Sequence, residues 1–343
     1  MMQPGMMQPG MMPQQQMMGG NPMMQMMQAM QMMMGGMPGA GVDPSAVPFA
    51  TPPGVQDGDA GLDADIIRPA LLAARVKQQE GVKTGTVLDV LCLSDDGKKS
   101  LGGIPKGCTI AFAGPPGKGK TRTALSTLAR VAASGMRVAY VVAEEGFHDE
   151  EGSGRDDLCS RMEKIGAAAT GLSAKKFEKE VLDNVYVLEA QYHKGQSWDD
   201  FVSKYRYLVE KEDINFVIID SLNMLDPTRN RTADNLSSLK TYNHEKGITC
   251  LCIGQIRDTG QPVGGSQLMH TADAVFLLDE MTLSSKDIAA RWGGTYRDKI
   301  DVLYAVKSVT TPTFAHPVRV VKNDIGELQV HDDQPADLAV LPA

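Results

Sequence analysis

A length of 343 residues is enough for two average domains, and the net charge of −8 argues against a surface coated with nucleic acid, so any contact with DNA has to be local. The five cysteines form no C-x-x-C pair, and their spacing indicates neither a zinc site nor a disulfide framework. This cysteine usage is typical of the reducing cytoplasm, where we expect the protein to act.

Residues 1–62 are expected to form a disordered tail and linker. The first 42 residues contain no Asp, Glu, Lys or Arg and hold 17 of the 22 methionines, and the next stretch is rich in Pro, Gly and Asp. Alternatively, residues 23–34, MMQMMQAMQMMM, form a helix whose thioethers bind a protein partner. The tail lacks the charged start of a signal peptide, and Gln, Pro and Gly break every apolar run short of the ~18 residues that a membrane span requires.

The rest of the chain is expected to form one linking helix and one α/β domain. Residues 63–81 show a helical pattern, residues 82–333 would form the domain, and residues 334–343 would be a C-terminal tail. Short apolar runs recur along the domain at 108–114, 137–143, 185–189, 216–220, 248–254, 273–279 and 301–307. Helical stretches separate the first five of these runs, at 120–134, 155–167, 197–211 and 232–246.

This alternation predicts a mostly parallel sheet with helices on both of its faces. The last runs, from residue 273 onwards and including VRVVK and ELQV, have shorter connections and could form an antiparallel extension.

The stretch GPPGKGKT, residues 114–121, fits the phosphate-binding pattern G-x-x-x-x-G-K-[ST] without a mismatch. Glycines let the backbone N–H groups approach phosphate closely, and the helix that follows adds its positive N-terminal end. Lys120 would contact the β- and γ-phosphates of ATP, and the Thr121 hydroxyl would bind Mg²⁺. The predicted nucleotide-binding residues are Gly114, Pro115, Pro116, Gly117, Lys118, Gly119, Lys120, Thr121 and Arg122.

Three further polar side chains end predicted strands. Asp220 follows FVII and would hold Mg²⁺ together with Thr121. Glu144 follows YVVA and is the expected general base, with Glu145 as its neighbour or as a solvated loop acid. Gln255 ends another strand, where its amide would respond to the γ-phosphate, or would simply be a polar residue leaving the sheet.

A P-loop followed by strand-ending Glu, Asp and Gln resembles the RecA-type ATPase core. Over about residues 82–330 the chain looks most like the bacterial RadA family, with KaiC-like and DnaB-helicase-like ATPases more distant; KTGTVLDVL and CLCIGQIRDTGQPVGGSQLMHTADAVFLLD carry much of this likeness. The chain lacks the four-cysteine element and the C-terminal protease-like domain of RadA. It has AVKSVTTPT where that family carries Lys-Asn-Arg-Phe-Gly.

The resemblance implies a ring or filament, with a hexamer expected, in which a cation from the adjacent subunit completes each site. Lys307 is our candidate for this cation, with Arg297 and Lys299 in reserve and a solvated strand-end lysine as the alternative. It also implies that two loops face single-stranded DNA, which would place Arg229, Arg231 and Arg257 at phosphates. Neither loop contains the aromatic residues that stack on bases.

These features predict a Mg²⁺-dependent ATPase of the RecA/RadA type that acts on DNA in recombination, repair or replication. One alternative is a KaiC-like regulatory ATPase that controls a protein assembly and uses the methionine-rich tail to bind a partner. Another alternative is a DnaB-like helicase.

Overall fold

In the computed structural model the chain divides into two units, Met1–Arg75 and Val76–Ala343. The structure describes residues 78–148, 156–191, 195, 197–225, 231–256 and 270–342, all of which belong to the second unit. The predicted tail, most of the predicted linking helix, Arg229 and Arg257 lie outside the described residues. Predictions about them therefore remain predictions.

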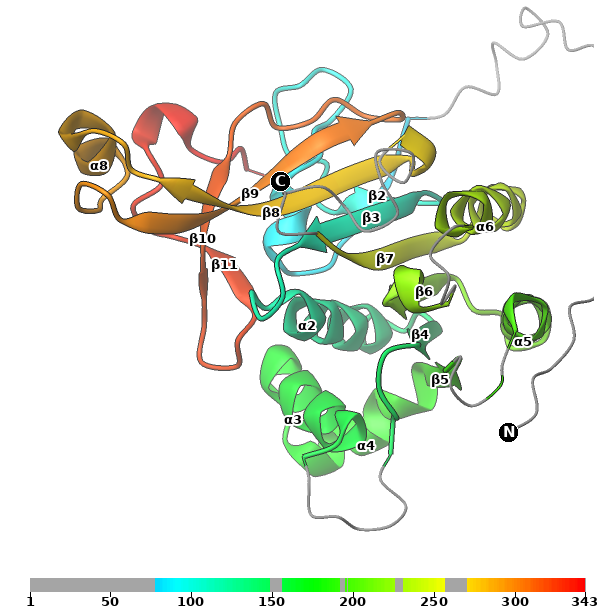
Figure 1. The fold of residues 1–343 in the computed structure, drawn as a ribbon. Helices are drawn as coiled ribbons and strands as arrows, with labels where there is room; N and C mark the ends of the chain where they lie inside the picture. Colours follow the sequence, from blue (N-terminus) through cyan, green and yellow to red (C-terminus); the bar gives the residue numbers. More distant parts are fainter. Residues whose placement is uncertain are drawn as a thin grey trace, which may run out of the picture. The chain divides into compact units, whose positions relative to one another are not determined.

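A nine-stranded sheet forms the centre of the described unit (Figure 1). In spatial order its strands are β11 (Leu328–Val330), β10 (Val318–Lys322), β9 (Lys299–Ser308), β8 (Ala274–Thr282), β3 (Thr109–Gly114), β7 (Thr249–Gln255), β6 (Phe216–Asp220), β4 (Val138–Val142) and β5 (Val185–Glu189). The strands from β8 to β5 pair in parallel. Strands β9, β10 and β11 add to the β8 edge in antiparallel pairs.

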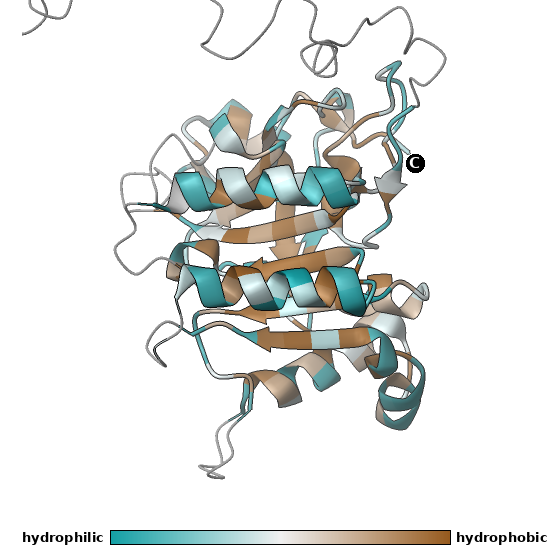
Figure 2. Ribbon diagram, turned by 90° about the vertical axis from the view of Figure 1, so that its right-hand side faces the viewer, coloured by the Kyte–Doolittle hydropathy of each residue, from teal (hydrophilic) through white to brown (hydrophobic). Residues whose placement is uncertain are grey.

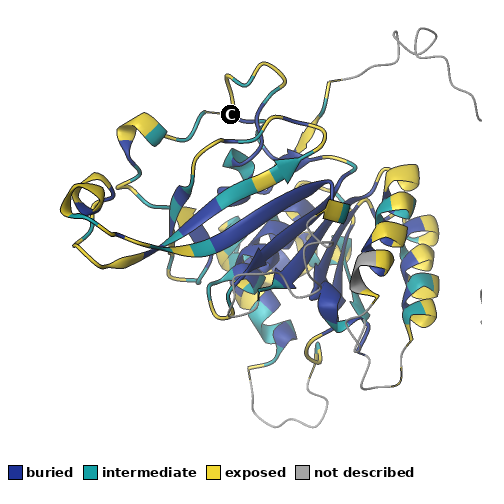
Figure 3. Cartoon of the chain, turned by 45° about the horizontal axis from the view of Figure 1, so that its top comes forward, coloured by how far each residue is buried: buried dark blue, intermediate teal, exposed yellow. Residues whose placement is uncertain are grey.

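Helices cover both faces of the parallel part of the sheet. One face carries α2 (Lys120–Ala133), α3 (Leu158–Thr170) and α4 (Ala174–Glu180). The other carries α5 (Trp198–Lys211) and α6 (Thr232–Lys246), which Figure 2 shows in front of the apolar strands with their hydrophilic sides turned outward. The outer sides of α5 and α6 are exposed, whereas β4 and β6 behind them are buried and the edge strand β5 is half-buried (Figure 3).

Successive side chains along each strand point to opposite faces of the sheet, so the apolar side chains are divided between two cores. On β3, Ile110 and Phe112 pack in the core under α2 and α3, whereas Ala111 faces α5 and α6. Strand β4 alternates in the same way: Tyr140 lies on the α2 side and Val141 on the α5 side. Because both faces are covered, every residue of β3 and of β4 is buried, which explains why these strands appear in the sequence as continuous apolar runs.

The predicted fold class, a mostly parallel sheet with helices on both faces, is confirmed. The expected antiparallel extension is present for β9, β10 and β11, but the expectation was wrong for the run at 273–279. That run forms β8, which pairs in parallel with β3. The chain between Gln255 and Ala274 is long enough to return to the edge of the sheet at which β3 begins, as a parallel pair requires.

Several short elements have too little periodicity to be predicted from sequence. They are α8 (Lys286–Arg291), the small antiparallel pair β1 (Gly81–Val82) and β2 (Ile104–Pro105), and the 3₁₀ turns at Val87–Val90, Leu182–Asn184, Leu222–Met224 and Ala336–Leu338. Helix α4 was missed as well, because it buries a single side chain, that of Phe177. Within the described ranges, no helix combines the length and apolar character needed to cross a membrane.

Candidate functional site

The phosphate-loop sequence, residues 114–121, connects β3 to α2 at the carboxyl edge of the parallel sheet. Gly117 and Gly119 have φ angles of 72° and 100°, in the left-handed region that favours glycine. A Cβ on Gly119 would also lie 2.8 Å from the carbonyl oxygen of Gly326. The loop therefore needs glycine at position 119 both for its backbone conformation and for its close contact with the β10–β11 turn.

Lys120 is the first residue of α2, and its side chain folds back over the loop. Its ammonium donates hydrogen bonds to the carbonyl oxygens of Gly114, at 2.8 Å, and Pro115, at 2.7 Å. Burial lowers the pKa of Lys120, and no carboxylate lies within ion-pair distance of it among the described residues. A buried ammonium without a carboxylate partner suits an anion bound in the loop.

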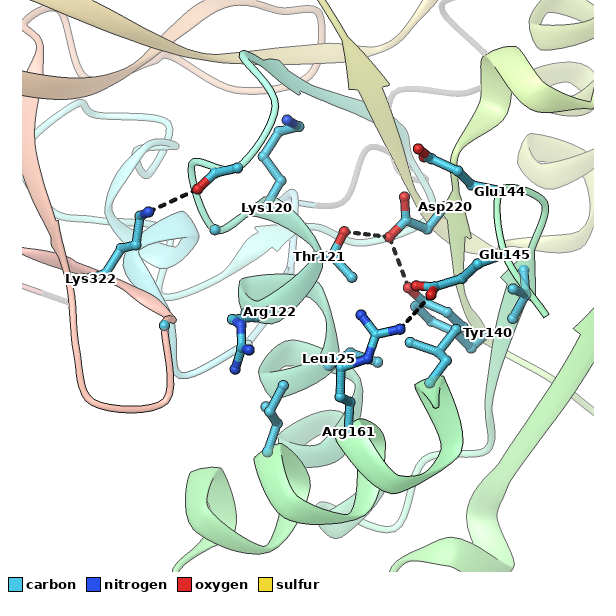
Figure 4. Close-up of a pocket in the computed structure, with 16 residues that line it drawn as sticks. Lys120, Thr121, Arg122, Leu125, Tyr140, Glu144, Glu145, Arg161, Asp220 and Lys322 are labelled. Carbon is cyan, nitrogen blue, oxygen red and sulfur yellow. Dashed lines mark hydrogen bonds and ion pairs between the residues drawn. The ribbon is translucent and has the colours of Figure 1, made fainter. Parts of the chain in front are cut away.

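Two hydroxyl groups converge on one oxygen of Asp220, at the end of β6 (Figure 4). Thr121 Oγ1 donates to Asp220 Oδ2 at 2.7 Å, and the phenol of Tyr140 donates to the same oxygen at 2.9 Å. Asp220 is only 8 % exposed, and this burial raises its pKa. A buried carboxylate beside a hydroxyl is the all-oxygen donor set that Mg²⁺ takes, so Asp220 and Thr121 fit this ion.

Glu144 and Gln255 meet although they belong to different strand ends: Glu144 lies just after β4, and Gln255 is the last residue of β7. The Gln255 amide donates from Nε2 to both carboxylate oxygens of Glu144, at 3.2 Å each. Partial burial, followed by repulsion from Asp220, raises the pKa of Glu144. The predicted base and the predicted γ-phosphate sensor are therefore linked directly in this structure.

Glu145 has a different partner from its neighbour Glu144. The guanidinium of Arg161, on α3, donates to Glu145 in an ion pair (Figure 4). This pair neutralises Glu145. Among the described residues, Glu144 forms no ion pair, and its partner is the neutral Gln255 amide. The assignment of Glu144 as the base remains a prediction.

Most of these groups line a cavity of about 420 Å³ between the loop, α2, α3 and the β10–β11 turn. It is lined by Gly117, Gly119, Lys120, Thr121, Arg122, Leu125, Tyr140, Val142, Glu144, Glu145, Leu158, Arg161, Ile165, Asp220, Lys322 and Gly326. Gln255 is not a lining residue and is linked to the cavity through Glu144. Sequence reasoning missed Tyr140, Arg161 and Lys322. Tyr140 lies inside β4, Arg161 lies inside α3, and Lys322 ends the antiparallel strand β10, so none belongs to the loop motif or to the carboxyl end of a parallel strand.

Two of the predicted nucleotide-binding side chains have partners on the antiparallel part of the sheet. Lys118 forms ion pairs with Asp301, at 2.7 Å, and Glu280, at 3.2 Å, so its side chain is engaged outside the cavity. Arg122 lines the cavity and donates to the carbonyl oxygen of Ile325 at 2.9 Å. Pro115 and Pro116 lie in the loop but do not line the cavity.

The candidate trans cation lies away from the cavity of its own chain. Lys307 on β9 is paired with Val275, near the start of β8, and its ammonium donates to the carbonyl oxygen of His270. The reserve candidates lie at the other end of β9: Lys299 forms an ion pair with Glu280, at 2.6 Å, and Arg297 lies over the ring of Tyr296. None of these three lines the cavity.

Of the predicted DNA-contacting residues, only Arg231 is described. It is exposed and immediately precedes α6. Arg229 and Arg257 lie outside the described residues, so the predicted cluster remains a prediction.

Comparisons with known proteins agree with this architecture. The chain is 26% identical over 204 residues, 55% of its length, to the DNA repair and recombination protein RadB of Methanosphaera stadtmanae, and the match spans 79% of that protein. The solved structure of a KaiC-like protein from Pyrococcus horikoshii superimposes with a TM-score of 0.52 at 19% identity, over 74% of this chain and 99% of that one, which shows a shared fold.

The predicted resemblance to RecA-type ATPases, with RadA-like and KaiC-like relatives, is confirmed. The sequence model of the KaiC family of ATPases matches residues 82–293, which is more than half of the chain. The protein therefore belongs to the KaiC ATPase family.

Proposed function

We propose that the protein is a Mg²⁺-dependent ATPase that assembles from several copies and acts on DNA. The observation that best supports the catalytic part is the meeting of Lys120, the Thr121–Asp220 pair and the Glu144–Gln255 pair at the carboxyl edge of one sheet. These groups come from four different strand ends or loops. Their convergence supplies phosphate binding, a metal-binding oxygen pair and a base.

Each side chain has a distinct part in the proposed reaction. The loop N–H groups and the Lys120 ammonium hold the phosphate chain, while Thr121 and Asp220 hold Mg²⁺, which supplies charge neutralisation on the phosphate oxygens when bound. Glu144 accepts the proton of the attacking water, and its raised pKa makes it a stronger base than a solvated carboxylate. Gln255 orients Glu144 and exchanges this contact for the γ-phosphate when ATP binds.

Action on DNA is supported by the relative that is named a DNA repair and recombination protein. The family match favours a second candidate, a regulatory ATPase in which ATP controls a protein assembly and the methionine-rich tail binds a partner. ATP hydrolysis measured with and without single-stranded DNA separates the two: a clear increase with DNA supports the first. No DNA binding at low salt with Mg-ATP, in an oligomeric preparation, would favour the second.

We expect Lys307→Ala to reduce ATP turnover with little loss of ATP affinity. Lys307 is level with the beginning of β8, whereas the loop follows the end of β3, so its ammonium faces the opposite edge of the sheet from its own cavity. It can complete a site only on a second copy of the chain, where a trans-acting cation contributes about 10³ to 10⁵ in rate in related phosphoryl-transfer enzymes. Turnover and ATP affinity of the variant test this.

Mixed assemblies provide the control for a trans role. Lys307→Ala subunits retain Glu144, and Glu144→Gln subunits retain Lys307, so one type of interface in the mixture combines an intact base with an intact lysine. Activity should reappear when the two inactive variants are mixed. If co-assembly is proven and no activity returns, Lys307 does not act across the interface.

We expect the double change Arg229→Ala and Arg231→Ala to weaken DNA binding to a similar extent for all sequences. If both arginines contact phosphates, the salt dependence should flatten by up to about one unit of log–log slope per lost contact. Basal ATP hydrolysis should stay close to that of the wild type. A control with the same charge change is Arg206→Ala with Arg291→Ala, on the exposed surfaces of α5 and α8. Equal losses in both double variants would show a general charge effect instead of a DNA-binding loop.

A further inference from the structure

The cationic side chains of the loop, α2, α3 and the end of β10 form two groups that differ in their partners. Lys118, Arg130 and Arg161 each form an ion pair with a carboxylate of the same chain. Such pairs neutralise the cation in place and leave little charge for a ligand.

Among the described residues, the hydrogen-bond partners of Lys120, Arg122 and Lys322 are all backbone carbonyl oxygens. Their partners are the carbonyls of Gly114 and Pro115 for Lys120, Ile325 for Arg122 and Gly117 for Lys322. All three cations line the cavity, and among the described residues none of them has a carboxylate within ion-pair distance. A carbonyl is a dipole and cannot neutralise a full charge, so this trio leaves a positive charge at the cavity that an anion would balance.

Lys322 is the member of the trio that comes from outside the loop and its helix. It is the last residue of β10, and its ammonium lies 2.8 Å from the carbonyl oxygen of Gly117, in the middle of the phosphate loop (Figure 4). An ammonium has three N–H donors. One of them is engaged by Gly117, and among the described residues no other contact occupies the remaining two, which are left for a ligand.

The turn that carries Lys322 is fixed firmly against α2. The backbone N–H of Leu328 donates to Thr123 Oγ1 at 3.0 Å. Arg130 binds Glu327 with two parallel hydrogen bonds of 2.9 and 3.0 Å, and the side chain of Glu327 is 2% exposed. Since a bidentate pair of this kind is geometrically specific, the backbone of Lys322 has a defined position at the rim of the cavity.

We propose that Lys322 is a nucleotide-binding residue that contacts the phosphate chain of the nucleotide held by the phosphate loop of the same chain. This inference rests on the proposed nucleotide site and adds to it a cation from the C-terminal part of the sheet. Phosphate is favoured over the base or sugar because an ammonium is a donor only, forms its strongest hydrogen bonds with anionic oxygens, and already lies on the loop that surrounds the phosphates.

Lys322→Gln tests the proposal, because glutamine keeps a polar side chain and loses the charge. Dissociation constants for ATP and ADP, and the inhibition constant of inorganic tripolyphosphate, should each rise about 10-fold, the effect of one charge-assisted hydrogen bond. Tripolyphosphate has no base or sugar, so its binding reports the phosphate contact directly. Lys322→Arg keeps the charge and should remain within a few-fold of the wild type.

Lys179→Gln, on the exposed surface of α4, is the matched control for the change in net charge and should bind all three ligands normally. Unchanged tripolyphosphate inhibition in Lys322→Gln would overturn the proposal. So would equal losses in Lys322→Gln and Lys322→Arg, since lysine would then only anchor the turn to Gly117. Normal nucleotide binding by a folded Lys120→Ala variant would instead contradict the proposed nucleotide site itself.

Discussion

Replacing Lys120 by alanine is expected to abolish ATP turnover and to weaken nucleotide binding by about 100-fold or more. Lys120 is 7% exposed, and among the described residues its ammonium has two carbonyl oxygens as partners, so its buried charge is available to the β- and γ-phosphates. Two charge-assisted hydrogen bonds of about 1.5–3 kcal/mol each account for a loss of that size. Nucleotide affinity and hydrolysis rate, measured on the same preparation, test the expectation.

The control is Lys176→Ala, which removes an exposed lysine from α4. It should bind and hydrolyse ATP as the wild type does. The Lys120 variant should keep its folded circular dichroism spectrum, because the two apolar cores contain no part of that side chain. A well-folded Lys120→Ala protein with wild-type turnover would contradict the assignment of this loop to the nucleotide.

The parts of the candidate site that follow a local rule could be predicted from sequence. A phosphate loop is contiguous, so its residues and its position between a strand and a helix can be read directly. Asp220, Glu144 and Gln255 each end an apolar run, and the carboxyl ends of parallel strands meet at one edge of a sheet. Their convergence follows from the parallel fold, which the alternating pattern predicted.

Residues placed by packing could not be predicted in this way. Tyr140 is in the middle of an apolar run and looks like a core residue, yet its hydroxyl binds Asp220. Arg161 occupies an ordinary position on α3, and Lys322 is about 200 residues from the loop that it contacts. No spacing of residues in the sequence predicts such contacts, because they depend on how the helices and strands pack.

Strand direction also decides what a strand-end residue can reach. Lys307 ends an apolar run as Asp220 does, and sequence alone could place it at either edge. Because β9 is antiparallel to β8, its carboxyl end lies at the edge opposite the phosphate loop. Lys307 therefore cannot reach the phosphate loop of its own chain, and the role that we propose for it is in the site of a neighbouring copy.

Replacing Glu144 by glutamine is expected to leave Mg-ATP binding nearly intact and to slow hydrolysis by about 10² to 10⁴, the usual contribution of a general base. Glutamine keeps the shape of the side chain and loses its basicity. Glu145→Gln is the matched variant one residue away and should have the milder effect, because Arg161 already neutralises that carboxylate. Single-turnover hydrolysis rates of the two variants decide the order, and the reverse order would show that the roles within the pair are exchanged.

The pH profile gives an independent test of the same role. Glu144 has its pKa raised above the ordinary value of 4.5, by partial burial first and by Asp220 second. A base acts only when deprotonated, so the hydrolysis rate of the wild type should fall as the pH is lowered through this raised pKa. In Glu144→Gln, the residual hydrolysis has no carboxylate to protonate at this position, so this limb of the profile should disappear. If the limb persists unchanged, the group that titrates is another acid, and Asp220, whose pKa is also raised by burial, becomes the first to examine.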